Sequence, residues 1–194
     1  FYVEHVLQSS KGDLFLALFF GTTFAFLPLW VMLARKFGKK EIWFTSLLIS
    51  SSAIGAILLV GPGDVALYGF LLGLSGVGYG ATFAIPPSMQ ADVIDFDEWK
   101  FGTRREGEFV GIWSIIKKLA MALGAGMVFP ILKGFGYLPN QVQSPETVQS
   151  IRILYAGLPC LTGFIAMLLV LKYPIDRKLH ASIRSEIEER TKIR

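Results

Sequence analysis

The sequence predicts an all-α protein that crosses a membrane several times. Of its 194 residues, 53% are hydrophobic and only 18% are charged, whereas soluble domains have about 25% charged residues. The apolar residues gather in runs of about 20, the length that a helix needs to cross a hydrocarbon core of about 30 Å. These runs lack the alternation of apolar and polar residues that is typical of membrane barrels. A polytopic helical membrane protein is therefore the expected fold class.

Five apolar runs define the expected transmembrane helices. The runs cover residues 14–33, 42–60, 65–85, 109–132 and 154–171. None has the basic start and small-residue cleavage site of a signal peptide. On this basis, residues 13–172 form the membrane region. We expect residues 1–12 to be the end of a truncated transmembrane helix followed by an outer loop, and residues 173–194 to form a tail.

Basic residues assign the two sides of the membrane. Most of the 19 Lys and Arg residues fall in three groups: four within 35–40, three within 100–105 and seven within 172–194. Because Lys and Arg accumulate in cytoplasmic segments, we expect inner loops at 34–41 and 91–108 and a cytoplasmic tail. Residues 61–64 and 133–150 are then the outer loops. This topology accounts for the net charge of +4, so nucleic acid is not an expected partner.

The few cysteine and histidine residues, and the lack of catalytic motifs, argue against several kinds of site. Cys160 is the only cysteine, so neither a disulfide framework nor a thiolate metal site is expected. His5 and His180 are far apart in sequence and lack companions at metal-ligand spacing. The sequence shows no Ser–His–Asp set and no phosphate-binding loop. We therefore expect no enzyme activity, no cofactor and no metal site.

Four glycines predict a packing face on the third apolar run. Gly69, Gly73, Gly76 and Gly80 recur at steps of four, three and four, which places them on one side of a helix. Small residues at such a seam let a second helix backbone approach closely. The four glycines are therefore expected to pack against a neighbouring helix, along which the third helix could slide or rock.

Lys117 and Lys118 interrupt the fourth apolar run. Lys118 lies nine residues beyond Phe109, or about 14 Å along a helix, which is close to the middle of the membrane. A Lys at that depth costs about 2.5 to 3.5 kcal/mol on insertion. Such charges usually face a wet cavity or an acidic partner.

Substrate binding or ion coupling is the hypothesis for this pair. Lys118 is the stronger candidate, because it shares a helix face with the small residues Gly111, Ala122 and Ala125. Lys117 points elsewhere, since adjacent residues differ by about 100° on a helix. None of the five runs contains Asp or Glu. The partner is therefore expected to be the ligand or an acid outside these five helices.

The segment between the third and fourth runs mixes acids with bases. Two interpretations fit this composition: a solvated loop, or a set of ion pairs that closes the inner mouth of a transport path. Exposed pairs contribute only about 0 to 1 kcal/mol each, which suits a reversible gate. The candidate gate residues are Asp92, Asp95, Glu98, Arg104, Arg105 and Glu106.

The tail predicts an amphipathic helix. Ile175, Leu179, Ile183 and Ile187 follow one another at steps of four among charged residues. One apolar face of this kind suits a helix that lies on the membrane surface or on the protein. A solvated terminal helix remains an alternative.

Several motifs resemble one transporter family. Residues 91–107 (ADVIDFDEWKFGTRREG) are similar to the inner loop of the glycoside–pentoside–hexuronide:cation symporters, the melibiose-permease relatives within the major facilitator superfamily. Residues 118–124 (KLAMALG) resemble that family's eleventh helix, whose lysine near the binding cavity matches Lys118. Lys117 has no counterpart there. Shorter matches are PLW at 28–30, ARKFGKK at 34–40, SPE at 144–146 and YP at 173–174.

The resemblance implies the C-terminal six-helix half of a major facilitator fold, with its first helix truncated. Such transporters have two halves that rock about a central site. The implied function is cation-coupled symport of a sugar or glycoside with Na⁺ or H⁺ by alternating access. The coupling cation would be bound mainly by the N-terminal half, which this sequence lacks. The expected partners are therefore the sugar, membrane lipid and that N-terminal half.

The expected location is a bacterial plasma (inner) membrane.

The sequence is also compatible with two alternatives to sugar symport. One is a lysophospholipid:sodium symporter from a related branch, which would also retain the lysine. The other is a half-size membrane partner protein.

Overall fold

The described part of the chain consists of helices joined by short connections. The computed structural model describes residues 2–139 and 141–192, and these residues form no strand. Five helical segments are long and apolar enough to cross a membrane, so the predicted all-α, polytopic fold class is confirmed. Residues 1, 140 and 193–194 lie outside the described residues. They belong to the expected truncated helix, outer loop and tail.

The membrane-length segments follow the five predicted runs but extend beyond them. They are Gly12–Phe37, Lys39–Leu59, Val65–Phe101, Glu106–Gly134 and Pro145–Leu171. The individual elements are η1 (Tyr2–Val6), α1 (Gly12–Phe37), α2 (Lys39–Ala56), η2 (Ile57–Leu59), α3 (Val65–Tyr79), α4 (Ala81–Phe101), α5 (Glu106–Gly134), α6 (Pro145–Arg152), η3 (Ile153–Gly157), α7 (Leu158–Leu171) and α8 (Arg177–Lys192).

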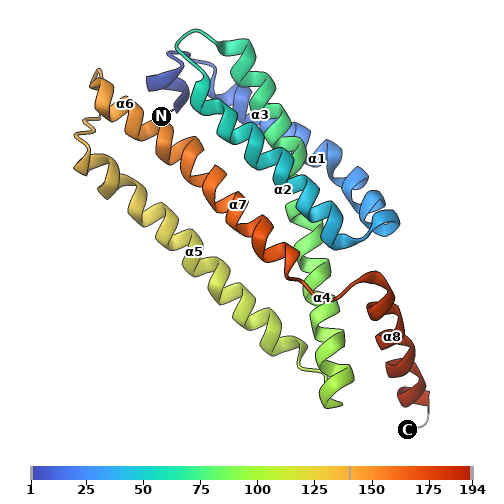
Figure 1. Cartoon of the computed structure of the whole chain (residues 1–194). Coiled ribbons are helices and arrows are strands. Elements are labelled where there is room, and N and C mark those ends of the chain that lie inside the picture. The colour runs from blue at the N-terminus through green and yellow to red at the C-terminus, as the bar shows by residue number, and fades with distance from the viewer. Residues whose placement is uncertain (1, 140, 193–194) are drawn as a thin grey trace.

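The helices form a bundle with one helix set apart. In Figure 1, α1, α2 and α3 lie together and α7 runs along α2. Helix α4 continues from α3 and is accompanied by α8. Helix α5 runs along the side, and among its residues only Leu132 is buried. The N-terminal segment and α6 lie at one end of the molecule, whereas the α4–α5 connection and α8 lie at the other.

The third helix differs from its expected extent. Gly80 keeps helical dihedral angles (φ −53°, ψ −35°), so α3 passes directly into α4, which reaches Phe101. Much of the expected inner loop 91–108 is therefore helical. The charged residues suggested a loop, but no glycine or proline follows Pro87 until Gly102. Gly102 adopts the left-handed conformation (φ 74°) and donates a hydrogen bond to Glu98 O at 2.8 Å, which ends the helix.

The glycine face of α3 lies against α1. A Cβ atom on Gly76 would lie 2.6 Å from Phe19 O, and one on Gly80 would lie 2.6 Å from Thr23 O. Gly69 and Gly73 face α1 side chains at ordinary or slightly short contact distances. The Thr23 hydroxyl, which is buried, donates to Gly76 O at 3.1 Å. The two helix backbones thus approach each other more closely than side chains would allow.

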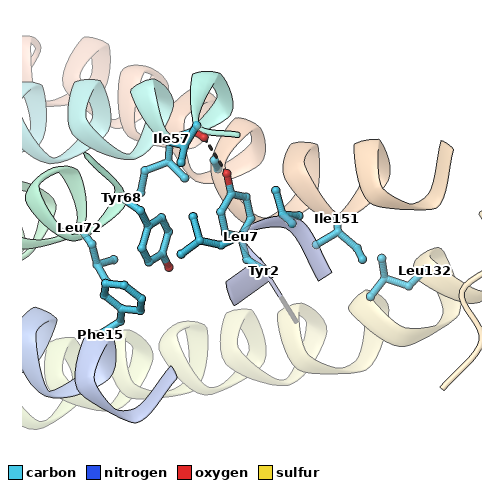
Figure 2. Close-up of a cluster of buried hydrophobic side chains, with 11 residues drawn as sticks. Tyr2, Leu7, Phe15, Ile57, Tyr68, Leu72, Leu132 and Ile151 are labelled. Atoms are coloured by element: carbon cyan, nitrogen blue, oxygen red, sulfur yellow. Dashed lines mark hydrogen bonds between the residues drawn. The ribbon is translucent and has the colours of Figure 1, made fainter. Parts of the chain in front are cut away.

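A buried cluster ties the N-terminal segment to the bundle. Figure 2 shows Tyr2 between α3 and the α6–η3 region, with its hydroxyl donating to Ile57 O at 2.7 Å. The Tyr2 ring stacks on Tyr68 and on Tyr155, and the two latter hydroxyls are 2.8 Å apart. Burial raises the pKa of Tyr2. Aromatic packing therefore holds the N-terminal segment against α3 and η3.

Helix α8 packs on the protein. It lies against α4, with Ile183 only 1% exposed and Ile175 also buried. The Trp99 indole on α4 donates to Glu186 at 2.7 Å, and Arg190 donates to Trp99 O at 2.8 Å. Of the possibilities that the sequence allowed for the tail, the structure shows the one in which its apolar face contacts the protein.

Candidate functional site

A cluster of charged side chains occupies the end of the molecule where α4 meets α5. We call it the ion-pair cluster. It draws residues from the start of α2, the second half of α4, the α4–α5 connection and α8. Its members are Lys39, Asp92, Asp95, Asp97, Glu98, Arg104, Arg105, Glu106 and His180.

Arg104 contacts three acids of the ion-pair cluster. Its guanidinium contacts Asp95 at 3.2 Å, Glu98 at 2.8 Å and Glu106 at 3.0 Å. The first two acids lie one turn apart on α4, and the third begins α5. The structure thus brings four of the six sequence-predicted gate residues into one contact group that joins the two helices.

Arg105 pairs with an acid outside the predicted set. Its Nε and Nη2 atoms donate to Asp97 at 3.0 and 2.5 Å, a bidentate geometry that gives strong, directional pairs. Asp97 is 7% exposed. The sequence contained no signal that separated Asp97 from the neighbouring acids, because its burial depends on how α4 is turned.

Asp92 is held by residues from distant parts of the chain. It is 4% exposed, and Lys39 from the start of α2 contacts it at 2.6 Å while also donating to Ser88 O at 3.1 Å. His180 Nε2 on α8 lies 3.2 Å from Asp92 and 3.1 Å from Asp95. Sequence reasoning missed Lys39 and His180 as members. The sequence contained no signal for them, because these contacts depend on how α2 and α8 pack against α4.

The surroundings favour the charged forms of the two arginines and the neutral form of the nearby Tyr173. Hydrogen bonds from Arg104 to Glu98 and Glu106 raise its pKa. The hydrogen bond to Asp97 raises the pKa of Arg105. Burial, reinforced by the charge of Asp92, raises the pKa of Tyr173, whose hydroxyl donates to Met89 O at 3.2 Å. Because both arginines stay charged over the physiological range, the cluster persists until the helices that carry it separate.

The lysine pair lies apart from the ion-pair cluster. Lys117 and Lys118 are exposed on α5, about 18 Å along the helix from its start at Glu106. Among residues 2–139 and 141–192, neither ammonium group has an ion-pair or hydrogen-bond partner. Gly111, on the same face as Lys118, has nothing within 4 Å of a Cβ position. This face of α5 is open to a ligand or to further protein.

The described residues hold no group of three or more His, Cys, Asp or Glu side chains arranged for a metal ion.

Together, the fold and the charged groups define an integral membrane protein with a salt-bridged end and a lysine pair within a spanning helix. The chain also matches a known family model, described as MFS/sugar transport protein, over residues 1–177. The chain therefore belongs to this family of glycoside–pentoside–hexuronide symporters within the major facilitator superfamily.

Individual relatives agree with this assignment. The chain is 34% identical over 176 residues to an uncharacterized symporter from Synechocystis, covering 88% of the chain and 32% of the relative. It is 28% identical to a glucuronide carrier protein homolog from Escherichia coli, covering 100% of the chain and 43% of the relative. It is 27% identical to an isoprimeverose transporter from Lactiplantibacillus pentosus, covering 81% and 33%. The chain thus spans less than half the length of these relatives.

Proposed function

We propose that this chain is one half of a secondary active transporter that moves a sugar or glycoside together with Na⁺ or H⁺ by alternating access. Membership in the MFS/sugar transport family supports a transport function. A relative described as an isoprimeverose transporter supports a sugar-type substrate. In this proposal the tail faces the cytoplasm of a bacterial inner membrane, as the basic segments 34–41 and 173–194 suggest.

The ion-pair cluster is the observation that carries this proposal. It joins α2, α4, α5 and α8 through ion pairs between their side chains. Arg104 is 47% exposed, so its pairs are of the kind that water can replace at small cost. In the proposed mechanism these contacts hold the inner end closed and separate when the transport path opens to the cytoplasm.

Lys118 has the second role in the proposal. An ammonium group near the middle of the membrane needs a polar partner, and the described residues supply none. A sugar hydroxyl can accept a hydrogen bond from Lys118, and an acid from the other half can balance its charge. Either contact would couple ligand binding to the position of α5.

A thermal-shift screen of the complete transporter that contains this chain tests the function. Sugars, glucuronides and lysophospholipids would each be added in detergent with Na⁺, with Li⁺ or with neither ion. A ligand at 100 times its dissociation constant stabilises the folded state by about 2.7 kcal/mol. We expect stabilisation by a sugar or glycoside, and we expect it to increase with the coupling ion.

Other results would change the conclusion. Stabilisation by lysophospholipid alone would contradict the sugar proposal and favour the lysophospholipid carrier. Stabilisation by a sugar that is the same with and without the ions, at pH values on both sides of neutrality, would contradict cation coupling.

A further inference from the structure

Two apolar grooves lie side by side near the ion-pair cluster and share a wall. The first, of about 370 Å³, is bounded by α4 and by the first turns of α5, including Ile112 and Trp113. The second, of about 290 Å³, is bounded by α7. The shared wall consists of Trp43, Met89 and Tyr173. Trp113 remains 45% exposed, so the first groove opens to the side of the molecule.

Two basic side chains lie beside these grooves. Lys172 lines the second groove and is exposed. Lys40 donates to Tyr173 O at 3.0 Å, which places its ammonium group beside the shared wall. Lys40 and Lys172 both come from segments expected to face the cytoplasm. Anionic lipids are concentrated in that leaflet and attract basic side chains near the surface.

The shared wall also contains an unused hydrogen-bond donor. Trp43 Nε1 is the one buried side-chain nitrogen or oxygen, among the described residues, that has no hydrogen-bond partner. Trp residues favour the level where the hydrocarbon core meets the head groups, since one edge is polar and the rest apolar. A small rotation of the indole would offer this N–H to an acceptor at the mouth of the grooves.

We propose that the paired grooves bind one anionic phospholipid. Its two acyl chains would lie in the two grooves, on either side of Trp43 and Tyr173. Its phosphate would lie at the end of the shared wall, between Lys172 and Lys40. The apolar linings do not suit a sugar, and the two chains of a phospholipid match two adjoining grooves. This site is separate from the proposed sugar path and does not depend on it.

Fluorescence quenching by brominated lipids tests the site. The complete transporter that contains this chain would be reconstituted in vesicles that contain, at matched mole fraction, phosphatidylglycerol or phosphatidylcholine with brominated acyl chains. Bromine quenches tryptophan only at close range, so Trp43 and Trp113 report occupation of the grooves. A variant with Trp43→Phe and Trp113→Phe retains Trp30 and Trp99 and gives the background.

We expect greater quenching by the phosphatidylglycerol than by the phosphatidylcholine. This excess should disappear in the background variant and in Lys40→Gln/Lys172→Gln. It should persist in the matched control Lys36→Gln/Lys178→Gln, which removes two exposed charges from the same basic segments. If Lys40→Gln/Lys172→Gln does not reconstitute, Lys172→Gln alone replaces it. Equal quenching by both lipids, or an equal loss in the control, would overturn the proposal.

Discussion

At the scale of single residues, the environments of the charged groups separate two kinds of role. Asp92 and Asp97 are buried, and each is paired with a cation from another part of the chain, Lys39 and Arg105 respectively. Lys118 is exposed within an apolar helix and has no partner among the described residues. The buried, paired acids hold helices together, whereas the exposed lysine is available to contact a ligand or another part of the transporter.

Replacement of Lys118 tests this distinction. We expect Lys118→Ala to lower coupled uptake by the complete transporter about tenfold or more, equivalent to about 1.4 kcal/mol, because a polar contact in the transport path is lost. Insertion into the membrane should be unchanged or improved. Uptake of radiolabelled substrate, corrected for protein in the membrane, measures the effect. Lys133→Ala, at the far end of α5, is the control, and normal uptake in Lys118→Ala would refute the role of Lys118.

The Arg105–Asp97 pair provides a charge-swap experiment. Arg105→Glu should impair uptake, because two acids would then face each other across the α4–α5 connection. The double variant Asp97→Arg/Arg105→Glu restores opposite charges and should recover part of the uptake. Arg105→Glu combined with Asp95→Arg is the control, since Asp95 contacts Arg104 and His180 instead. Recovery of uptake to the same extent in both double variants would argue against a specific pair.

At the scale of elements, α1 and α3 make the closest backbone contact described above. The glycine seam allows this approach, and the Thr23 hydroxyl crosses it to Gly76 O. Because the glycines contribute no side chains, the α3 side of the seam is smooth, and it resists sliding less than an interface with interlocking leucines on both helices would. We therefore propose that relative motion of α1 and α3 accompanies transport.

Gly76→Ala measures how tightly the seam is packed. The added methyl group would lie 2.6 Å from Phe19 O, and overpacking of this kind costs about 1 to 3 kcal/mol. The gain in helix propensity, about 1 kcal/mol, offsets only part of that cost. The thermal midpoint in detergent should fall. Gly126→Ala, with nothing within 4 Å of its Cβ position, should leave the midpoint unchanged or raise it; equal midpoints in the two variants would contradict close packing at Gly76.

The number and order of the spanning helices could be predicted from the sequence, because hydropathy and length are local properties. The end of α4 was missed because charged residues do not break a helix by themselves, whereas Gly102 does. The contacts among the acids and arginines within residues 92–106 could be predicted from the sequence, since these residues are close to one another along the chain. Lys39 and His180 could not be assigned to Asp92, because those contacts depend on how α2 and α8 pack against α4.

At the scale of the whole molecule, the two ends have different chemistry. One end holds stacked tyrosines and apolar side chains around Tyr2 and Tyr68, and the other holds ion pairs around Arg104. Alternating access requires each end to open in turn. The exposed pairs of Arg104 can be exchanged for contacts with water at small cost, so we propose that this end opens toward the aqueous cytoplasm.

Cysteine labelling tests the sidedness on which this proposal depends. In a Cys160→Ala background, Val142→Cys lies between α5 and α6 and Ser182→Cys lies on α8. Both positions are exposed. A membrane-impermeant maleimide should label Val142→Cys in intact cells and Ser182→Cys only after permeabilisation. Labelling of Ser182→Cys in intact cells would reverse the assigned topology.

The unbroken passage from α3 into α4 has a mechanical consequence. The joined helix has 37 residues and is about 55 Å long, against a hydrocarbon core of about 30 Å. We propose that it turns as a lever about the glycine seam. A tilt of about 10° moves a point about 30 Å from the fulcrum by about 5 Å. On this proposal, a displacement that is small near the fulcrum becomes large enough at the far tip to separate the atoms of a salt bridge.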